Sequence, residues 1–140
     1  MKHDKNVTRY VGKLSNKLRR KIDAFPNSTS FSGTQNRVLH FLLSQTDDVF
    51  QKDIEEEYCL RPPTATQLLR KMEDNGLICR VPLNNDGRKK KIIVTEKAME
   101  YKDIVMENIT DLENTLVKDI PKDELEIFLK VTEKMIENLS

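Results

Sequence analysis

Residues 61–76 read RPPTATQLLRKMEDNG, and this stretch marks both ends of one short helix. Pro62 and Pro63 fit a first helical turn, where backbone N–H groups have no partner inside the helix, and Gly76 fits the C-terminal cap. Between them, apolar residues recur at three- and four-residue steps, as on the buried face of an amphipathic helix: Ala65, Leu68, Leu69 and Met72. Polar residues point the other way: Thr64, Gln67, Arg70 and Lys71. We predict a helix over residues 62–75 whose outer face can contact a partner.

A β-hairpin is predicted directly after this helix. The β-favouring runs LICRV and KIIV flank the sequence PLNNDGRKK, which is rich in turn residues. Four cations follow the turn, and strand alternation should place Lys89 and Lys91 on one side and Lys90 on the other. A carboxylate at the tip would repel a polyanion unless it were paired, so we expect Asp86 to hold a cation such as Arg88. Arg80 can pair with one of the two acidic residues that end the preceding helix, Glu73 and Asp74.

The residues before the helix complete a recognisable order of elements. An extended piece at Val49–Phe50 leads into a short helix with Ile54 and Tyr58 on its apolar side. Short helix, tight turn, second helix and hairpin, in this order, predict a winged helix-turn-helix, which we assign to residues 33–98. The predicted fold class is mainly α with a small β-hairpin wing.

Amphipathic helices flank this core within a single domain over residues 1–140. Ser32 or Thr34 can cap a helix that buries Gln35, Val38, Leu39 and Leu42. The N-terminal helix, within residues 1–25, has an apolar side formed by Val11, Leu14, Leu18, Ile22 and Phe25. A long helical stripe runs from residue 98, through Ala98, Tyr101, Val105, Ile109, Leu112 and Leu116, and a last helix follows it. Because this stripe is longer than one core requires, we predict that residues 1–25 and 98–140 are dimerisation helices of a homodimer.

The net charge of +1 conceals a strong segregation of charge along the chain. Residues 61–97 hold nine Lys/Arg and four Asp/Glu, a net charge of +5, whereas residues 98–140 hold five and eleven, a net charge of −6. Charges in solution act over about one Debye length, roughly 8 Å, so a partner responds to the local potential. The segment with the predicted helix and hairpin can therefore attract a polyanion.

Several classes of protein are disfavoured by the sequence. No apolar run approaches the roughly 20 residues of a membrane span, and MKHDKNVTRY lacks the apolar segment of a secretory signal, so we expect a cytoplasmic protein without a membrane partner. Cys59 and Cys79 have neither CxxC spacing nor neighbouring histidines, and we expect buried or half-buried free thiols. No phosphate loop, nucleophile elbow or metal-ligand spacing occurs, so we predict no catalytic residue, no metal and no cofactor.

The charge and geometry suit duplex DNA. A helix about 10–12 Å wide fits the major groove, where donor and acceptor patterns distinguish all four base pairs. Gln67 can bond adenine, Arg70 can engage guanine at two points, and Arg88 can reach the narrow minor groove. A merely solvated face is the alternative for these residues. The full set of predicted DNA contacts is Gln51, Arg61, Pro63, Thr64, Thr66, Gln67, Arg70, Lys71, Asp86, Arg88, Lys89 and Lys90.

Over roughly residues 33–98 the sequence resembles the MarR-type transcriptional regulators. The resemblance rests on three stretches in combination with the order of the flanking helices: GTQNRVLHFL, VFQKDIEEEYCLRPPTATQLLRKMEDNGLICR and DGRKKKIIVT. It implies a homodimer with intertwined terminal helices, a recognition helix at residues 62–75, and a pseudo-palindromic operator, often with release by an effector. It also implies wing contacts by Asp86 and Arg88, and recognition-helix contacts by Thr64, Thr66, Gln67 and Arg70.

We therefore expect a homodimeric, sequence-specific regulator of transcription, more often a repressor than an activator, with a small-molecule effector as an added partner. A basic cluster in the N-terminal helix either adds phosphate contacts or lines a site for an acidic effector: Lys13, Lys17, Arg19, Arg20 and Lys21. The rival function is a winged-helix module that binds protein or RNA without specificity for duplex DNA. An enzyme is a distant third possibility.

Overall fold

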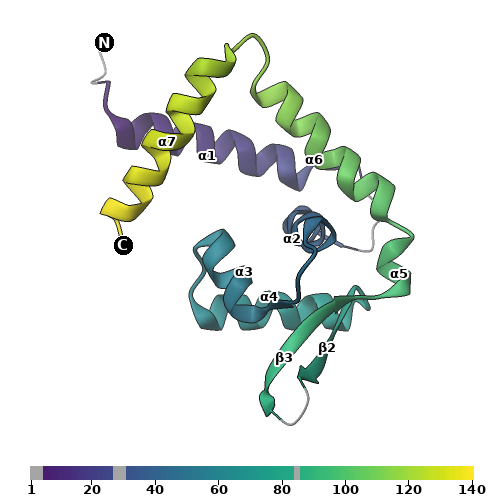
Figure 1. Cartoon of the computed structure of the whole chain (residues 1–140). Helices are drawn as coiled ribbons and strands as arrows, with labels where there is room; N and C mark the ends of the chain where they lie inside the picture. Colours follow the sequence, from purple (N-terminus) through teal and green to yellow (C-terminus); the bar gives the residue numbers. More distant parts are fainter. Residues whose placement is uncertain (1–4, 27–30, 84–85) are drawn as a thin grey trace. The chain divides into compact units, whose positions relative to one another are not determined.

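The computed structural model describes residues 5–26, 31–83 and 86–140, with only the backbone of Asp86 and Gly87. Internal contacts divide the chain into two compact units, Met1–Ile109 and Thr110–Ser140, and each is described by itself. Figure 1 shows the helices and strands in chain order. The first unit contains α1 (Val7–Asp23), α2 (Gly33–Ser44), β1 (Val49–Phe50), α3 (Gln51–Tyr58), α4 (Pro62–Asp74), β2 (Ile78–Leu83), β3 (Asp86–Val94), α5 (Glu96–Met99) and the start of α6 (Lys102–Leu116). The second contains the end of α6 and α7 (Lys122–Asn138).

Side-chain caps fix the starts of three helices. The Asn6 carboxamide oxygen accepts from the Arg9 N–H at 3.0 Å at the start of α1. The Ser32 hydroxyl accepts from the Gln35 N–H at 3.2 Å, so Ser32 is the cap of α2. Thr95 caps α5, since its hydroxyl accepts from the Ala98 N–H at 3.1 Å. Each such bond satisfies a donor that the helix leaves unpaired and stabilises the helix by about 1 kcal/mol.

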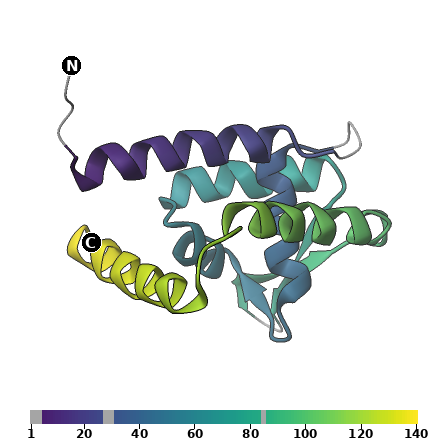
Figure 2. The same ribbon diagram turned by 90° about the horizontal axis from the view of Figure 1, so that it is seen from above.

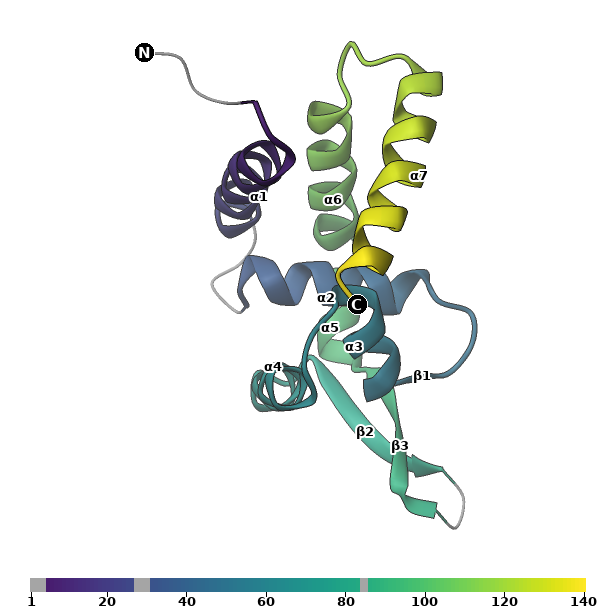
Figure 3. The same cartoon turned by 90° about the vertical axis from the view of Figure 1, so that its left-hand side faces the viewer.

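The sheet has the strand order β1-β3-β2, with antiparallel pairing throughout. The predicted hairpin is confirmed, and the extended piece at Val49–Phe50 joins it as a third strand, which pairs with Ile92 and Lys91. Cross-strand partners lie on the same face of a sheet, so the pair of Arg80 and Ile92 faces inward while Cys79 and Ile93 face outward. Figures 1 and 3 show β2 and β3 extending past the helices as a wing.

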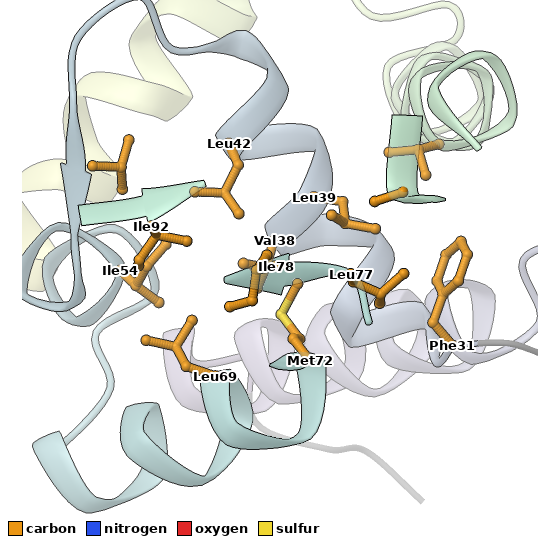
Figure 4. Close-up of a cluster of buried hydrophobic side chains, with 13 residues drawn as sticks. Phe31, Val38, Leu39, Leu42, Ile54, Leu69, Met72, Leu77, Ile78 and Ile92 are labelled. Carbon is orange, nitrogen blue, oxygen red and sulfur yellow. The ribbon is translucent and has the colours of Figure 1, made fainter. Parts of the chain in front are cut away.

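The core of the first unit lies where α2, α3, α4, β2 and β3 meet, as the side chains drawn in Figure 4 show. Figure 2 shows the ribbon of the same elements from above. The three helices and the residue before β2 contribute fully buried apolar side chains: Leu39 from α2, Ile54 from α3, Leu69 and Met72 from α4, and Leu77. Burying one such side chain stabilises the fold by about 1.5–3 kcal/mol. The predicted buried face of α2 is confirmed, because Gln35, Val38, Leu39 and Leu42 are all buried.

Polar bonds connect α2 to its neighbours. Asn36 is fully buried, and its amide donates to the Val105 carbonyl at 3.3 Å while its carboxamide oxygen accepts from Asn108 at 2.9 Å. At the other side, Asn75 donates to the Gln35 side chain at 3.0 Å. Hydrogen bonds between buried polar groups are directional. The bond from Asn75 to Gln35 therefore fixes the end of α4 relative to α2.

The prediction of one continuous helical stripe beginning at residue 98 is wrong, because α5 ends at Met99 and α6 begins at Lys102. The N–H groups of Glu100 and Tyr101 bond carbonyls three residues earlier, at 3.2 and 3.0 Å, which closes a tight turn. The Tyr101 ring then lies edge-on to Phe31, with 5.2 Å between centroids. Packing within the unit therefore overrides the periodicity of the sequence.

The expectation of buried or half-buried thiols is also wrong, because Cys59 and Cys79 are both exposed. Cys79 lies on the outward face of β2, opposite the face that carries the buried Ile78. Cys59 is the C-terminal cap of α3 and has φ 50° and ψ 45°, in the left-handed region. That conformation is unfavourable for any residue with a Cβ, by about 1–2 kcal/mol.

Cys59→Gly is expected to raise the free energy of unfolding by about 0.5–1 kcal/mol, as judged by urea denaturation. Glycine adopts the left-handed region without strain, although its greater freedom in the unfolded chain offsets part of the gain. Cys59→Ala removes the thiol but keeps the Cβ, so it should leave stability nearly unchanged. Equal stability of the two variants would contradict a strained turn.

Candidate nucleic-acid interface

One side of α4 is turned away from the core. Ala65, Leu69 and Met72 are fully buried on the inner side. Successive residues on a helix are rotated by about 100°, which places Gln67 almost diametrically opposite this stripe. The flanking outer positions are exposed as well: Arg61, Pro63, Thr64, Arg70 and Lys71. The outer face of α4 therefore presents hydroxyl, amide and guanidinium groups together.

Side-chain contacts hold α3, the helix before the turn, against α2. The Tyr58 hydroxyl donates to the Arg37 carbonyl at 2.9 Å, and the Arg37 guanidinium lies 5.2 Å from the centre of the Tyr58 ring. Phe41 meets the same ring edge-on at 6.1 Å. Burial raises the pKa of Tyr58 to about 12, so its phenol remains a hydrogen-bond donor throughout the neutral range. These contacts hold α3 in place as the support for α4.

Two predicted DNA contacts, Gln51 and Thr66, are bonded to each other. The Gln51 amide donates to the Thr66 hydroxyl at 2.9 Å and to the Glu55 carboxylate at 3.2 Å. The Thr66 hydroxyl donates in turn to the Pro62 carbonyl at 2.9 Å. Both side chains are half-buried. Their principal bonds therefore join the start of α3 to the first turns of α4.

The cations of the wing occupy different positions on β3. Lys89 lies over the Phe50 ring, with its Nζ 4.8 Å from the centroid, and Lys91 lies 3.9 Å from the Asp48 carboxylate. Both contacts are made with β1 or with the residue before it. Arg88 and Lys90 are exposed. The predicted side-chain role of Asp86 lies outside the described residues.

Several acidic side chains near these cations already have partners. The Asp53 carboxylate accepts from the Phe50 N–H at 2.8 Å at the start of α3. Glu73 accepts two bonds from Arg80, at 2.6 and 3.0 Å, which confirms the predicted ion pair. Glu73 repels an approaching phosphate less than a free carboxylate does, because the charge of Arg80 offsets its own.

The outer face of α4 and the wing point in a common direction. In Figures 1 and 3, α4 and the hairpin both lie below α2, and the hairpin reaches furthest from it. Since the buried stripe of α4 is turned toward the core that contains α2, its outer face is turned the same way as the wing. A rod-shaped polyanion can therefore touch both elements at once.

Sequence reasoning missed the contacts of β1 with the wing. Phe50 contacts Lys89 and Asp48 contacts Lys91, while Arg88, Lys89 and Lys90 are all exposed. The signal was present, since an extended Val49–Phe50 was predicted, but its pairing with β3 is a long-range contact that periodicity does not reveal. Among the described residues no group of three or more His, Cys, Asp or Glu could hold a metal ion, and none of the described helices has the length and apolar character of a membrane span.

These elements define a winged helix-turn-helix protein, with α3 and α4 as the helix pair and β2–β3 as the wing. The model of the MarR family matches residues 31–90. The transcription regulator MarR from Oenococcus oeni PSU-1 has 27% sequence identity and a TM-score of 0.85, with 94% of this chain and 99% of that chain covered. The S. aureus MepR-DNA complex has 25% identity and a TM-score of 0.83, with 97% and 100% covered. These matches confirm the resemblance of the chain to the MarR family of transcription regulators.

Proposed function

We propose that this protein is a sequence-specific regulator of transcription that binds duplex DNA through the outer face of α4 and the wing. The observation that carries the proposal is the common direction of these two surfaces, one rich in base-reading groups and the other in cations. The similarity to the S. aureus MepR-DNA complex supports it. In this proposal Thr64, Gln67 and Arg70 read base edges.

The remaining predicted contacts take supporting roles in the proposed complex. Arg61, Pro63 and Lys71 lie on the outer side of α4 and would meet the sugar-phosphate backbone, as would Lys89 and Lys90 on the wing. Arg88 would enter the minor groove, with Asp86 as its neighbour in the strand. Gln51 and Thr66 would act mainly by holding α4, with backbone contact as a second role.

The proposed regulator acts as a homodimer. Large apolar side chains are exposed on the terminal helices of both units: Val7, Tyr10, Val11 and Leu14 on α1, and Ile127, Phe128, Leu129, Val131 and Ile136 on α7. Runs of exposed apolar groups of this size mark protein interaction surfaces. A two-fold dimer repeats α4 and would bind two half-sites about one helical turn apart.

Repression and release by a small-molecule effector complete the proposal, which also places the protein in the cytoplasm. A cavity of about 320 Å³ between α1 and α2 supports an acidic effector, because Arg19 and Arg37 both line it, with Asp23 as a third charged group. The volume falls at the lower end of the range for ligand sites. The alternative role of the basic residues of α1 is contact with DNA phosphates.

Selection of bound duplexes from a random pool tests the proposal directly, and Arg88→Ala is the informative variant. We expect the wild-type chain to select a two-fold-symmetric site and Arg88→Ala to bind it more weakly by about 1–3 kcal/mol, the contribution of a charge-assisted hydrogen bond. Equal retention of all duplexes would contradict sequence reading. Unchanged binding by the variant would contradict a role for the wing.

Salt dependence separates this function from a module that binds protein alone. Each phosphate contact on B-DNA contributes about −0.9 to the slope of log affinity against log salt concentration. A duplex-binding regulator with several phosphate contacts should therefore show a steep negative slope. A protein-binding module would not lose its partner when Arg88 is replaced by alanine.

A further inference from the structure

Arg80 connects the wing to the recognition helix. It lies in β2, and its Nε and Nη2 both donate to the Oε1 of Glu73 in the last turn of α4, at 3.0 and 2.6 Å. The two side chains are only 23% and 32% exposed, so water competes weakly for the pair. Two N–H groups directed at one carboxylate oxygen fix the direction of the bond as well as its length.

The same guanidinium also reaches the start of α3. Its Nη1 donates to the Gln51 Oε1 at 3.5 Å, and the Gln51 amide donates to Thr66 at 2.9 Å and to the Pro62 carbonyl at 3.4 Å. Arg80, Glu73, Gln51 and Thr66 therefore form one hydrogen-bonded chain, here called the Arg80 network. It connects β2 with both the first and the last turns of α4.

The apolar contacts of α4 allow a small rotation of the helix, and the Arg80 network can prevent it. Ala65, Leu69 and Met72 set how deeply α4 packs, but dispersion and hydrophobic contacts have little directional preference, so they resist a small rotation of the helix only weakly. Base reading requires side chains placed to within about 0.5 Å. Hydrogen bonds near both ends of α4 supply the missing directionality.

We propose that Arg80 is a positioning residue that sets the orientation of α4 relative to the wing, so that both surfaces engage one duplex in register. The inference rests on the proposed function and assigns Arg80 no contact with DNA. The rival role, a phosphate contact by Arg80 itself, would have only two of the five N–H groups of the guanidinium, because three are used within the network.

A double-mutant cycle with Arg80→Met, Glu73→Gln and the double variant tests the inference. Methionine keeps the packing of the side-chain stem, and glutamine is nearly isosteric with glutamate. The measured quantities are the specificity ratio, which is the affinity for the selected operator divided by that for a scrambled duplex, and the salt slope on each duplex. Lys118→Met, an exposed position in the turn between α6 and α7, is the matched control for loss of one positive charge.

We expect each single variant to lower the specificity ratio about tenfold, the scale of one lost base contact, and the double variant to lower it no further. The salt slope of Arg80→Met should equal that of Lys118→Met and the wild type. Glu73→Gln is the sharper test, because removing an acidic group should strengthen binding if only charge mattered. Arg80→Lys, which keeps the charge but not the planar fork, should recover part of the ratio.

The outcomes separate this inference from the proposed function. A slope less negative by about 0.9 for Arg80→Met would make Arg80 a phosphate contact and overturn its positioning role. Additive losses in the double variant, or an unchanged ratio in both single variants, would overturn it as well. A wild-type chain that does not prefer the operator over the scrambled duplex would overturn the proposed function first. Circular dichroism and thermal melts of Glu73→Gln exclude loss of folding as the cause.

Discussion

Gly33→Ala is expected to lower the free energy of unfolding by about 2–3 kcal/mol. Gly33 is the first residue of α2 and lies against the last turn of α1, where a Cβ would lie 2.6 Å from the carbonyl carbon and 2.8 Å from the Cγ2 of Ile22, and closer still to the carbonyl oxygen. Backbone atoms cannot move aside as a flexible side chain can, so the overpacking falls in the upper part of its usual range. Urea denaturation followed by circular dichroism measures the change.

Gly12→Ala is the matched control for this substitution. Gly12 lies inside α1 with no atom within 4 Å of the position that a Cβ would take. Alanine is favoured over glycine inside a helix by about 0.5–1 kcal/mol, so this variant should be more stable than the wild type. If Gly33→Ala lowers the free energy of unfolding and Gly12→Ala raises it, the close approach of α1 and α2 is the cause of the loss at Gly33. A neutral Gly33→Ala would contradict that close approach.

Replacing both Gln67 and Arg70 by alanine is expected to weaken operator binding by about 3 kcal/mol, a factor of roughly 100. Both side chains are exposed on the outer side of α4, and each good base contact contributes about 1–3 kcal/mol of discrimination. Stability should change by no more than about 0.5 kcal/mol, because neither side chain packs in the core. Fluorescence anisotropy with the operator and with a scrambled duplex measures the effect.

The control for this pair is Asn114→Ala with Lys118→Ala, which removes one neutral amide and one positive charge from exposed positions of the second unit. It should leave operator binding close to that of the wild type. If the Gln67 and Arg70 variant weakens both duplexes equally, α4 contributes charge alone and does not read sequence. If it weakens neither, α4 is not the recognition helix.

Much of the fold is determined by local signals in the sequence. The prolines at the start of α4, Gly76 with φ 72° after its end, the Thr95 cap and the turn-rich hairpin each act within a few residues, so they could be recognised without tertiary information. The break between α5 and α6 could not be recognised in this way. The helical period continues across it, and the contact of Tyr101 with Phe31 joins residues far apart in the sequence, which periodicity does not reveal.

The outer face of α4 was likewise predictable, since an apolar stripe implies an opposite polar face. The hydrogen bonds that side chains form with residues far away in the sequence could not be predicted. Gln51 was predicted as a DNA contact, yet its amide is bonded to Thr66 and Glu55, and this depends on how α3 crosses α4. The exposure of Cys79 depends on which face of the sheet the helices cover, and alternation along one strand does not determine that.

Backbone amide chemical shifts, recorded while the selected duplex is titrated into the isotopically labelled protein, show whether α4 and the wing bind the same duplex. We expect the largest changes to fall together on residues 62–74 and on the wing around Arg88, and to saturate at the same duplex concentration. Changes confined to other helices, or changes on α4 without any on the wing, would show that the two surfaces do not meet one duplex.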